Sequence, residues 1–152
     1  MAIDRRHLGE VSEPRVIEVE KGQLRFFAKA TGETNPIYFD EEAAKAAGHP
    51  ALPAPPTFLF SLALGAPAKR GNILDADCGM GVDMRRILHG EQSFEYKRQI
   101  YAGDEVTLVT TTSEIYSKKG GALEFVAQDT TATNGAGDLL GTMRVVTVVR
   151  NG

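Results

Sequence analysis

The sequence predicts an α+β protein in which an antiparallel sheet of about five strands wraps around one central apolar helix. In the second half of the chain, strand patterns alternate with short turn signals, which predicts hairpins and therefore antiparallel pairing. Residues 57–64 are apolar on nearly every side, which places a helix there in the interior. An antiparallel sheet with one buried face needs an apolar layer against it, and this helix is the obvious candidate.

Length, charge and cysteine content restrict the class of protein. With 152 residues the chain is long enough to bury one core, so we expect a single domain over residues 1–152. The formal net charge is -3, with acids and bases interspersed, which favours neither nucleic acid nor an anionic membrane as a partner. The one cysteine, Cys78, excludes an internal disulfide framework, and no apolar run resembles a signal peptide or a membrane span. We therefore expect a cytoplasmic protein.

The first half is predicted to hold one strand and two helices before the apolar helix. Residues 14–20 alternate as a short strand, and residues 20–30 carry apolar side chains at helical spacing. Asp40 is placed to cap a short helix that begins with two glutamates and stops at Gly48. The four prolines of residues 49–56 then predict a rigid, extended segment.

The second half is predicted to consist of strands joined by tight turns. The turns are Ala102-Gly-Asp104, Lys118-Lys-Gly-Gly121 and Asn134-Gly-Ala-Gly-Asp138. The strands cover residues 92–100, 106–116, 123–133 and 139–150. In the last strand the period of two places Leu139, Met143, Val145 and Val149 on one face.

Residues 31–40 form the stretch whose order suggests chemistry. Pro36 excludes helical geometry at Asn35 and fixes its own backbone, so the neighbouring side chains are presented at a stiff corner. A carboxylate, Glu33, precedes this corner, and a phenol, Tyr38, follows it.

The corner and three later motifs resemble the MaoC-like hydratases and dehydratases. The corner reads Thr-Gly-acid-x-Asn-Pro-x-aromatic, and it is followed by Ala-Pro-Pro-Thr-Phe, Leu-His-Gly-Glu-Gln and Ala-Gly-Asp, so the matches span residues 24–104. The sequence looks most like the branch of the fungal fatty acid synthase dehydratase region, which includes non-catalytic subunits of (3R)-hydroxyacyl thioester dehydratases. The resemblance implies a hotdog fold, in agreement with the pattern of strands and helix.

The resemblance also implies a site at the corner. Active family members carry Gly-Asp-x-Asn-Pro-x-His, in which Asp and His activate the water that adds to a 2-enoyl thioester. Aligned on Gly32 and Asn35-Pro36, these positions hold Glu33 and Tyr38 here. A phenol with an ordinary pKa of about 10 is a donor and not a base near neutral pH. Glu33 and Tyr38 are therefore predicted to occupy degenerate catalytic positions, and the alternative is a structural role in which Glu33 caps a backbone turn and Tyr38 packs at the corner.

Further residues are candidates for binding the substrate. Besides Asn35 and Pro36, they are Thr57 and Phe58, which open the apolar helix and whose N–H groups would face a thioester oxygen, and His89, where a strand begins. Thr57 would also cap this helix, and His89 alternatively bonds to backbone. The local basic residues Arg85, Arg86, Lys97 and Arg98 are candidates for phosphate contacts or are solvated surface. No histidine has the spacing of a metal ligand, so no metal and no cofactor are predicted.

Three hypotheses follow for the function. The leading one is an (R)-specific 2-enoyl thioester hydratase or 3-hydroxyacyl thioester dehydratase component that binds the acyl group while a MaoC-like partner supplies the Asp and His dyad. The alternatives are a self-sufficient homodimeric hydro-lyase of fatty acid metabolism that uses Glu33, and an acyl-thioester-binding module without chemistry. Edge strands favour a homodimer or heterodimer in each case. Acyl-coenzyme A and acyl carrier protein remain equal candidates for the carrier.

Overall fold

The computed structural model describes residues 3–67 and 80–152, so Cys78 lies outside the described residues. Within these ranges the chain forms five strands and three α-helices. They are β1 (Arg15–Glu18), α1 (Lys21–Ala30), α2 (Glu41–Ala46), α3 (Phe58–Gly65), β2 (Ile87–Tyr96), β3 (Glu105–Lys118), β4 (Leu123–Thr133) and β5 (Leu139–Arg150). No helix in the described part of the chain is long and apolar enough to cross a membrane.

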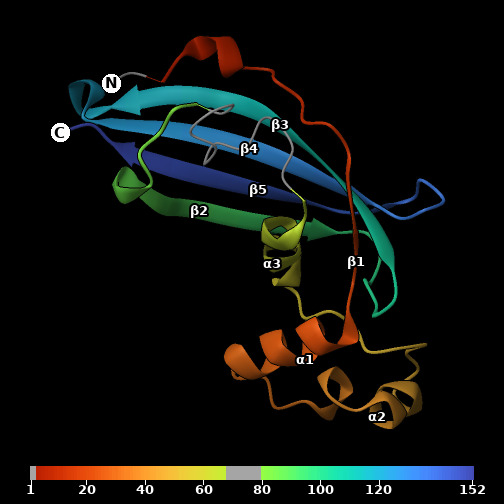
Figure 1. Ribbon diagram of the computed structural model, residues 1–152. Coiled ribbons are helices and arrows are strands. Elements are labelled where there is room, and N and C mark those ends of the chain that lie inside the picture. The colour runs from red at the N-terminus through yellow and green to blue at the C-terminus, as the bar shows by residue number, and fades with distance from the viewer. Residues whose placement is uncertain (1–2, 68–79) are drawn as a thin grey trace.

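The five strands form one antiparallel sheet in the order β1-β3-β4-β5-β2. The sheet is curved, and α3 lies between it and the pair α1 and α2 (Figure 1). Leu59 and Leu62 of α3 share one apolar core with Val106 and Leu108 of β3, all of them fully or almost fully buried. The predicted α+β architecture, with a sheet around an apolar helix, is confirmed.

The local signals of the first half act as predicted. The Asp40 carboxylate accepts hydrogen bonds from the N–H groups of Glu42 and Ala43 at 2.8 and 3.3 Å, which caps α2. Gly48 follows the helix with a φ of 91°, the left-handed geometry that ends helices. Lys21 pairs with Glu41 at 2.8 Å and so ties α1 to α2.

The prediction of a strand over residues 92–100 is wrong at both ends, because β2 runs from Ile87 to Tyr96. The strand begins earlier because a bulge at Gly90 interrupts the alternation that identifies a strand. It ends earlier because the chain then turns away from β5 to run beside the proline segment, where the N–H of Ala54 donates to the carbonyl of Ile100 at 2.8 Å.

The predicted face of β5 is corrected at its first residue. Leu139 is 37 % exposed, whereas Leu140 is buried in the core with Met143. The register shifts where Thr133 of β4 pairs with Leu139, and this irregularity brings Leu140 inward in its place.

The apolar helix differs from its prediction in two respects. Thr57 precedes α3 but its side chain makes no capping hydrogen bond. Only one side of α3 is buried, through Phe58, Leu59 and Leu62, while Leu64 is 64 % exposed.

Candidate functional site

The corner between α1 and α2 is held by its own backbone. Gly32 adopts a φ of 77°, and the N–H of Glu33 then donates to the carbonyl of Ala28 at 2.9 Å. The Asn35 side chain accepts from the N–H of Ile37 at 3.2 Å, which caps a single 3-10 turn over Pro36–Tyr38. Pro36 stands at the first position of this turn, where its missing N–H is harmless. The position of Tyr38 is therefore fixed by local bonds.

Glu33 and Tyr38 lie close enough to interact electrostatically. Both residues are half-buried. Burial raises the pKa of the Tyr38 phenol above its ordinary value, and the nearby Glu33 carboxylate raises it further. Tyr38 therefore remains protonated at neutral pH and offers a hydrogen-bond donor.

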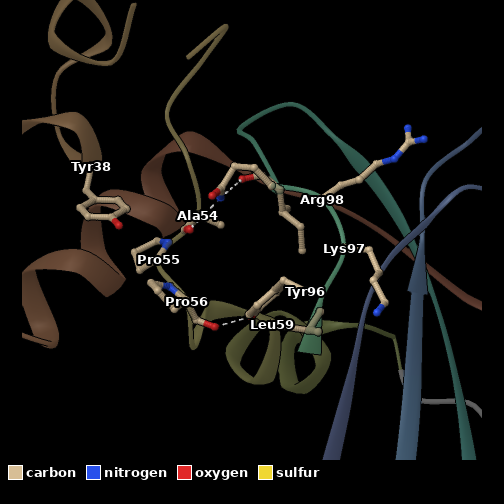
Figure 2. Close-up of a pocket in the computed structure, with 10 residues that line it drawn as sticks. Tyr38, Ala54, Pro55, Pro56, Leu59, Tyr96, Lys97 and Arg98 are labelled. Atoms are coloured by element: carbon tan, nitrogen blue, oxygen red, sulfur yellow. Dashed lines mark hydrogen bonds between the residues drawn. The ribbon is translucent and has the colours of Figure 1, made fainter. Parts of the chain in front are cut away.

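Tyr38 borders a cavity of about 280 Å³. Figure 2 shows Tyr38 on one side of this cavity and Lys97 and Arg98 on the other, with the proline segment between them. The corner, the entry to α3 and the end of β2 therefore converge on one space. Its lining residues are Tyr38, Ala54, Pro55, Pro56, Leu59, Tyr96, Lys97, Arg98, Gln99 and Ile100.

Tyr96 joins β2 to the entry of α3. Its hydroxyl donates to the carbonyl of Pro56. Burial raises the pKa of Tyr96 to about 12, although a hydrogen bond from the backbone of Leu59 acts in the opposite direction. Gln99 connects its own segment to the proline segment, because its amide donates to the carbonyls of Ala54 and Ile100 at 3.0 and 2.9 Å.

Two of the four candidate phosphate contacts line the cavity, and two do not. Lys97 pairs with Glu95, and Arg98 pairs with Asp138 at 2.9 Å, both on the exposed surface. Arg85 and Arg86 are exposed outside this cavity. Arg85 pairs with Asp83 at 2.8 Å, and this pairing lowers the pKa of the Asp83 carboxyl to about 2.

The remaining candidate residues do not line the cavity. Asn35 and Pro36 are exposed at the corner, where they act on the backbone. The N–H of Phe58 donates to the carbonyl of Pro55 at 3.0 Å, so this donor is already engaged. The Phe58 ring is buried against Phe27, with ring centroids 5.4 Å apart. Thr57 is exposed.

His89 lies further along β2. Its ring contacts Phe60 of α3 edge-on, with centroids 5.0 Å apart, and it is exposed to solvent. It therefore belongs to the surface beside α3 and not to the wall of the cavity.

Sequence reasoning missed Tyr96, Gln99 and Ile100 as site residues. The sequence pattern predicts residues 97–100 within a strand of the sheet, whereas Ile100 pairs with the proline segment. Two sequence features could have indicated this pairing: the apolar, proline-rich segment and the Ala102-Gly-Asp104 turn. Pro53 of that segment and Tyr101 next to that turn form an isolated β-bridge.

Known proteins resemble this chain in sequence and in fold. Residues 6–143 match the family model described as FAS1-like, dehydratase domain region. A UPF0336 protein of Streptomyces coelicolor is 42% identical over 121 residues, which cover 79% of this chain and 78% of that protein.

Two solved structures extend the comparison. A chain of the HadBC (3R-hydroxyacyl-ACP dehydratase) complex from Mycobacterium tuberculosis is 26% identical, with a TM-score of 0.76 and coverage of 93% of this chain and 96% of that one. A MaoC-like dehydratase has a TM-score of 0.81 at 23% identity, over 97% of this chain and 43% of that one. The hotdog fold expected from the resemblance is thereby confirmed, and the chain belongs to the family described as FAS1-like, dehydratase domain region.

Proposed function

We propose that this single-domain chain is the acyl-binding subunit of a cytoplasmic (R)-specific 2-enoyl thioester hydratase or 3-hydroxyacyl thioester dehydratase. A second MaoC-like chain supplies the catalytic Asp and His. The observation that carries the proposal is Tyr38, a phenol with a raised pKa that stands at the family's histidine position and borders the cavity.

The proton chemistry of the reaction argues against catalysis at this corner. Hydration of an enoyl thioester needs a base for water and an acid for carbon, each with a pKa near the working pH. Glu33 offers a carboxylate, but Tyr38 holds its proton more tightly than an ordinary phenol. Tyr38 therefore does not replace the family's histidine as a group that takes and gives a proton near neutral pH, which disfavours the self-sufficient hydro-lyase.

The cavity suits the thioester end of an acyl carrier. Its walls combine apolar Leu59 and Ile100 with the phenol of Tyr38, and Lys97 and Arg98 lie at its edge. Exposed ion pairs are weak, so Glu95 and Asp138 can be displaced from these cations by a phosphate group. Coenzyme A and the prosthetic group of an acyl carrier protein both bring such a phosphate.

The partner is proposed to pack at the β2 edge of the sheet. β2 is the last strand in the sheet order and is ten residues long, so among residues 3–67 and 80–152 no strand pairs with its outer side. Leu88 of β2 and Leu64 of α3 are 48 % and 64 % exposed. The similarity to a chain of the HadBC complex supports assembly with a second, different chain.

Thermal unfolding with crotonyl-coenzyme A tests acyl-thioester binding. The ligand is expected to raise the Tm of the full chain or of its complex with the partner, since binding to the folded state stabilises it. A double variant, Lys97→Ala with Arg98→Ala, is expected to lose most of this shift. The matched control removes Lys118 and Lys119, two cations at the β3–β4 turn, and should keep the shift. Absence of any shift in wild type contradicts the proposed function.

A further inference from the structure

The concave face of the sheet, on which α3 packs, carries a polar band between two apolar clusters. One cluster surrounds α3, and the other contains Ile115, Val126 and Val149 near the opposite end of the strands. Between them, paired positions on adjacent strands place polar side chains in the interior, and Thr112 and Thr130 are each only 3 % exposed. The members of the band used below are Gln92, Thr110, Thr112, Gln128 and Thr130.

Most of this band is satisfied internally, but Gln92 is not. The hydroxyls of Thr110 and Thr130 bond to each other at 2.8 Å, and the Gln128 amide donates to the Thr112 hydroxyl at 3.3 Å. The amide nitrogen and oxygen of Gln92 are both buried, and neither has a hydrogen-bond partner among the described residues. A buried polar group without a partner is destabilising, so this amide calls for an explanation.

Gln92 lies on a line that starts at the cavity. Tyr96, Phe94 and Gln92 occupy every second position of β2 and therefore face the same side of the sheet. Tyr96 borders the cavity, and its ring stacks parallel to that of Phe94 with centroids 6.0 Å apart. Gln92 is four residues from Tyr96, which along a strand is about 13 Å.

The line offers an apolar path followed by a polar end. Phe94 packs against the core cluster that contains α3, and Val145 beside Gln92 packs there as well. Phe60 of α3 contacts His89, which lies two paired positions beyond Gln92, past the bulge. The cavity lining ends at Tyr96, so an alkyl chain that extended from it along this face of β2 would meet Phe94 first and the Gln92 amide next.

We propose that Gln92 is a specificity-determining residue that recognises an oxygen function, a hydroxyl or a carbonyl, carried on the acyl chain far from the thioester. The inference rests on the proposed function, since it requires the chain to bind acyl thioesters. A primary amide offers N–H donors and an oxygen acceptor, so a hydroxyl can either accept a hydrogen bond from its nitrogen or donate one to its oxygen. The amide is closed off from solvent, so overlying side chains shift when the ligand arrives, and pairing of the amide offsets part of that cost.

The test compares two ligands that differ by one oxygen. Binding of dodecanoyl-coenzyme A and ω-hydroxydodecanoyl-coenzyme A to the full chain, alone and with its partner, is measured by titration calorimetry. Wild type is expected to prefer the hydroxylated chain by about tenfold, the value of one well-made hydrogen bond to a buried group. Gln92→Leu is expected to lose this preference while binding the plain chain at least as tightly.

A matched control lies on the same line of paired residues. Gln128 is also an amide of the polar band, but it is bonded to Thr112, so Gln128→Leu should keep the hydroxyl preference and lower the Tm. Gln92→Leu should not lower the Tm, because it removes an unpaired amide. If Gln92→Leu does not fold, the test uses Gln92→Met instead, because methionine has the same unbranched shape as glutamine.

The outcomes separate this inference from the proposed function. Equal binding of the two ligands by wild type, or a preference that survives in Gln92→Leu, overturns the role of Gln92 and leaves acyl binding intact. A further outcome is that Gln92→Leu lowers the Tm and wild type shows no ligand preference. The Gln92 amide would then be bonded to a structural water molecule, and this outcome also overturns its role in specificity. If neither thioester binds, acyl binding itself fails.

Discussion

Tyr38 and Glu33 interact through charge at the corner. The carboxylate opposes ionisation of the phenol, and burial of the ring acts in the same direction. The result is a neutral hydrogen-bond donor on the wall of a cavity. A donor of this kind can hold an oxygen atom of a ligand but does not remove a proton from water.

Replacing Glu33 by Gln is expected to lower the pKa of Tyr38, because a negative charge beside the phenol is removed. The tyrosinate absorbance of Glu33→Gln is titrated against wild type, with Tyr38→Phe assigning the signal. Glu42→Gln is the control, because Glu42 is exposed and pairs with Lys45. An unchanged Tyr38 titration in Glu33→Gln contradicts the interaction.

Tyr96 predicts how stability changes in alkali. Its pKa is about 12 in the folded chain and about 10 when unfolded, so folding favours the protonated phenol. This contribution is complete below pH 10 and is lost as the pH rises through about 12. The free energy of unfolding of wild type should therefore fall more steeply over this range than that of Tyr96→Phe. Parallel curves would show that Tyr96 is not protected by burial.

The sequence allowed part of this residue-scale description to be predicted. The positions of Glu33 and Tyr38 follow from the Asn-Pro corner, because proline restricts the backbone locally. The raised pKa of Tyr38 depends on burial by residues distant in the sequence. The place of Tyr96 at the cavity and the burial of the Gln92 amide also depend on such residues. The residues adjacent to them in the sequence do not predict those contacts.

At the scale of elements, the bulge of β2 depends on Gly90. A Cβ added at this residue would lie 2.7 Å from a methyl carbon of Val148 and 2.9 Å from the carbonyl oxygen of Val146. Both distances are shorter than side chains tolerate, and one of the two atoms is backbone. Glycine is therefore required for β2 to pair closely with β5.

Gly90→Ala is expected to destabilise the chain by about 1 to 3 kcal/mol, the usual effect of overpacking. Denaturant unfolding measures this change. Gly22→Ala is the control, because Gly22 lies in α1 with nothing within 4 Å of an added Cβ, and there alanine should be neutral or stabilising by up to about 1 kcal/mol. Equal stability of Gly90→Ala and wild type would exclude a close approach at the bulge.

The elements differed in how well the sequence predicted them. The bounds of β4 and β5 match the predicted residues 123–133 and 139–150, because alternation and strong turn residues coincide there. The predicted bounds of β2 are displaced, since a bulge breaks its period and Ile100 pairs with the proline segment instead. Local patterns identify regular strands better than strands that bend or leave a sheet.

At the scale of the whole molecule, the part of the chain that the structure describes leaves the long edge strand β2 without a strand neighbour on its outer side and part of α3 exposed. The edge is β2, and the exposed side chains beside it include Leu64 and Leu88. The hydrophobic pattern predicted a helix inside a sheet, and that architecture is confirmed. The pattern did not predict that Leu64 would be exposed, because a helix that is apolar on nearly every side does not indicate which side packs in the core.

Catalysis of crotonyl-coenzyme A hydration by the separated and combined chains tests the central claim most directly. A MaoC-like subunit with Gly-Asp-x-Asn-Pro-x-His is isolated with this chain from its own host, and each chain is assayed alone and in the reconstituted complex. We expect no turnover by this chain alone and turnover by the complex that survives Glu33→Gln but not replacement of the partner's motif Asp. Robust hydration by a homogeneous preparation of this chain, abolished by Glu33→Gln, would contradict the account.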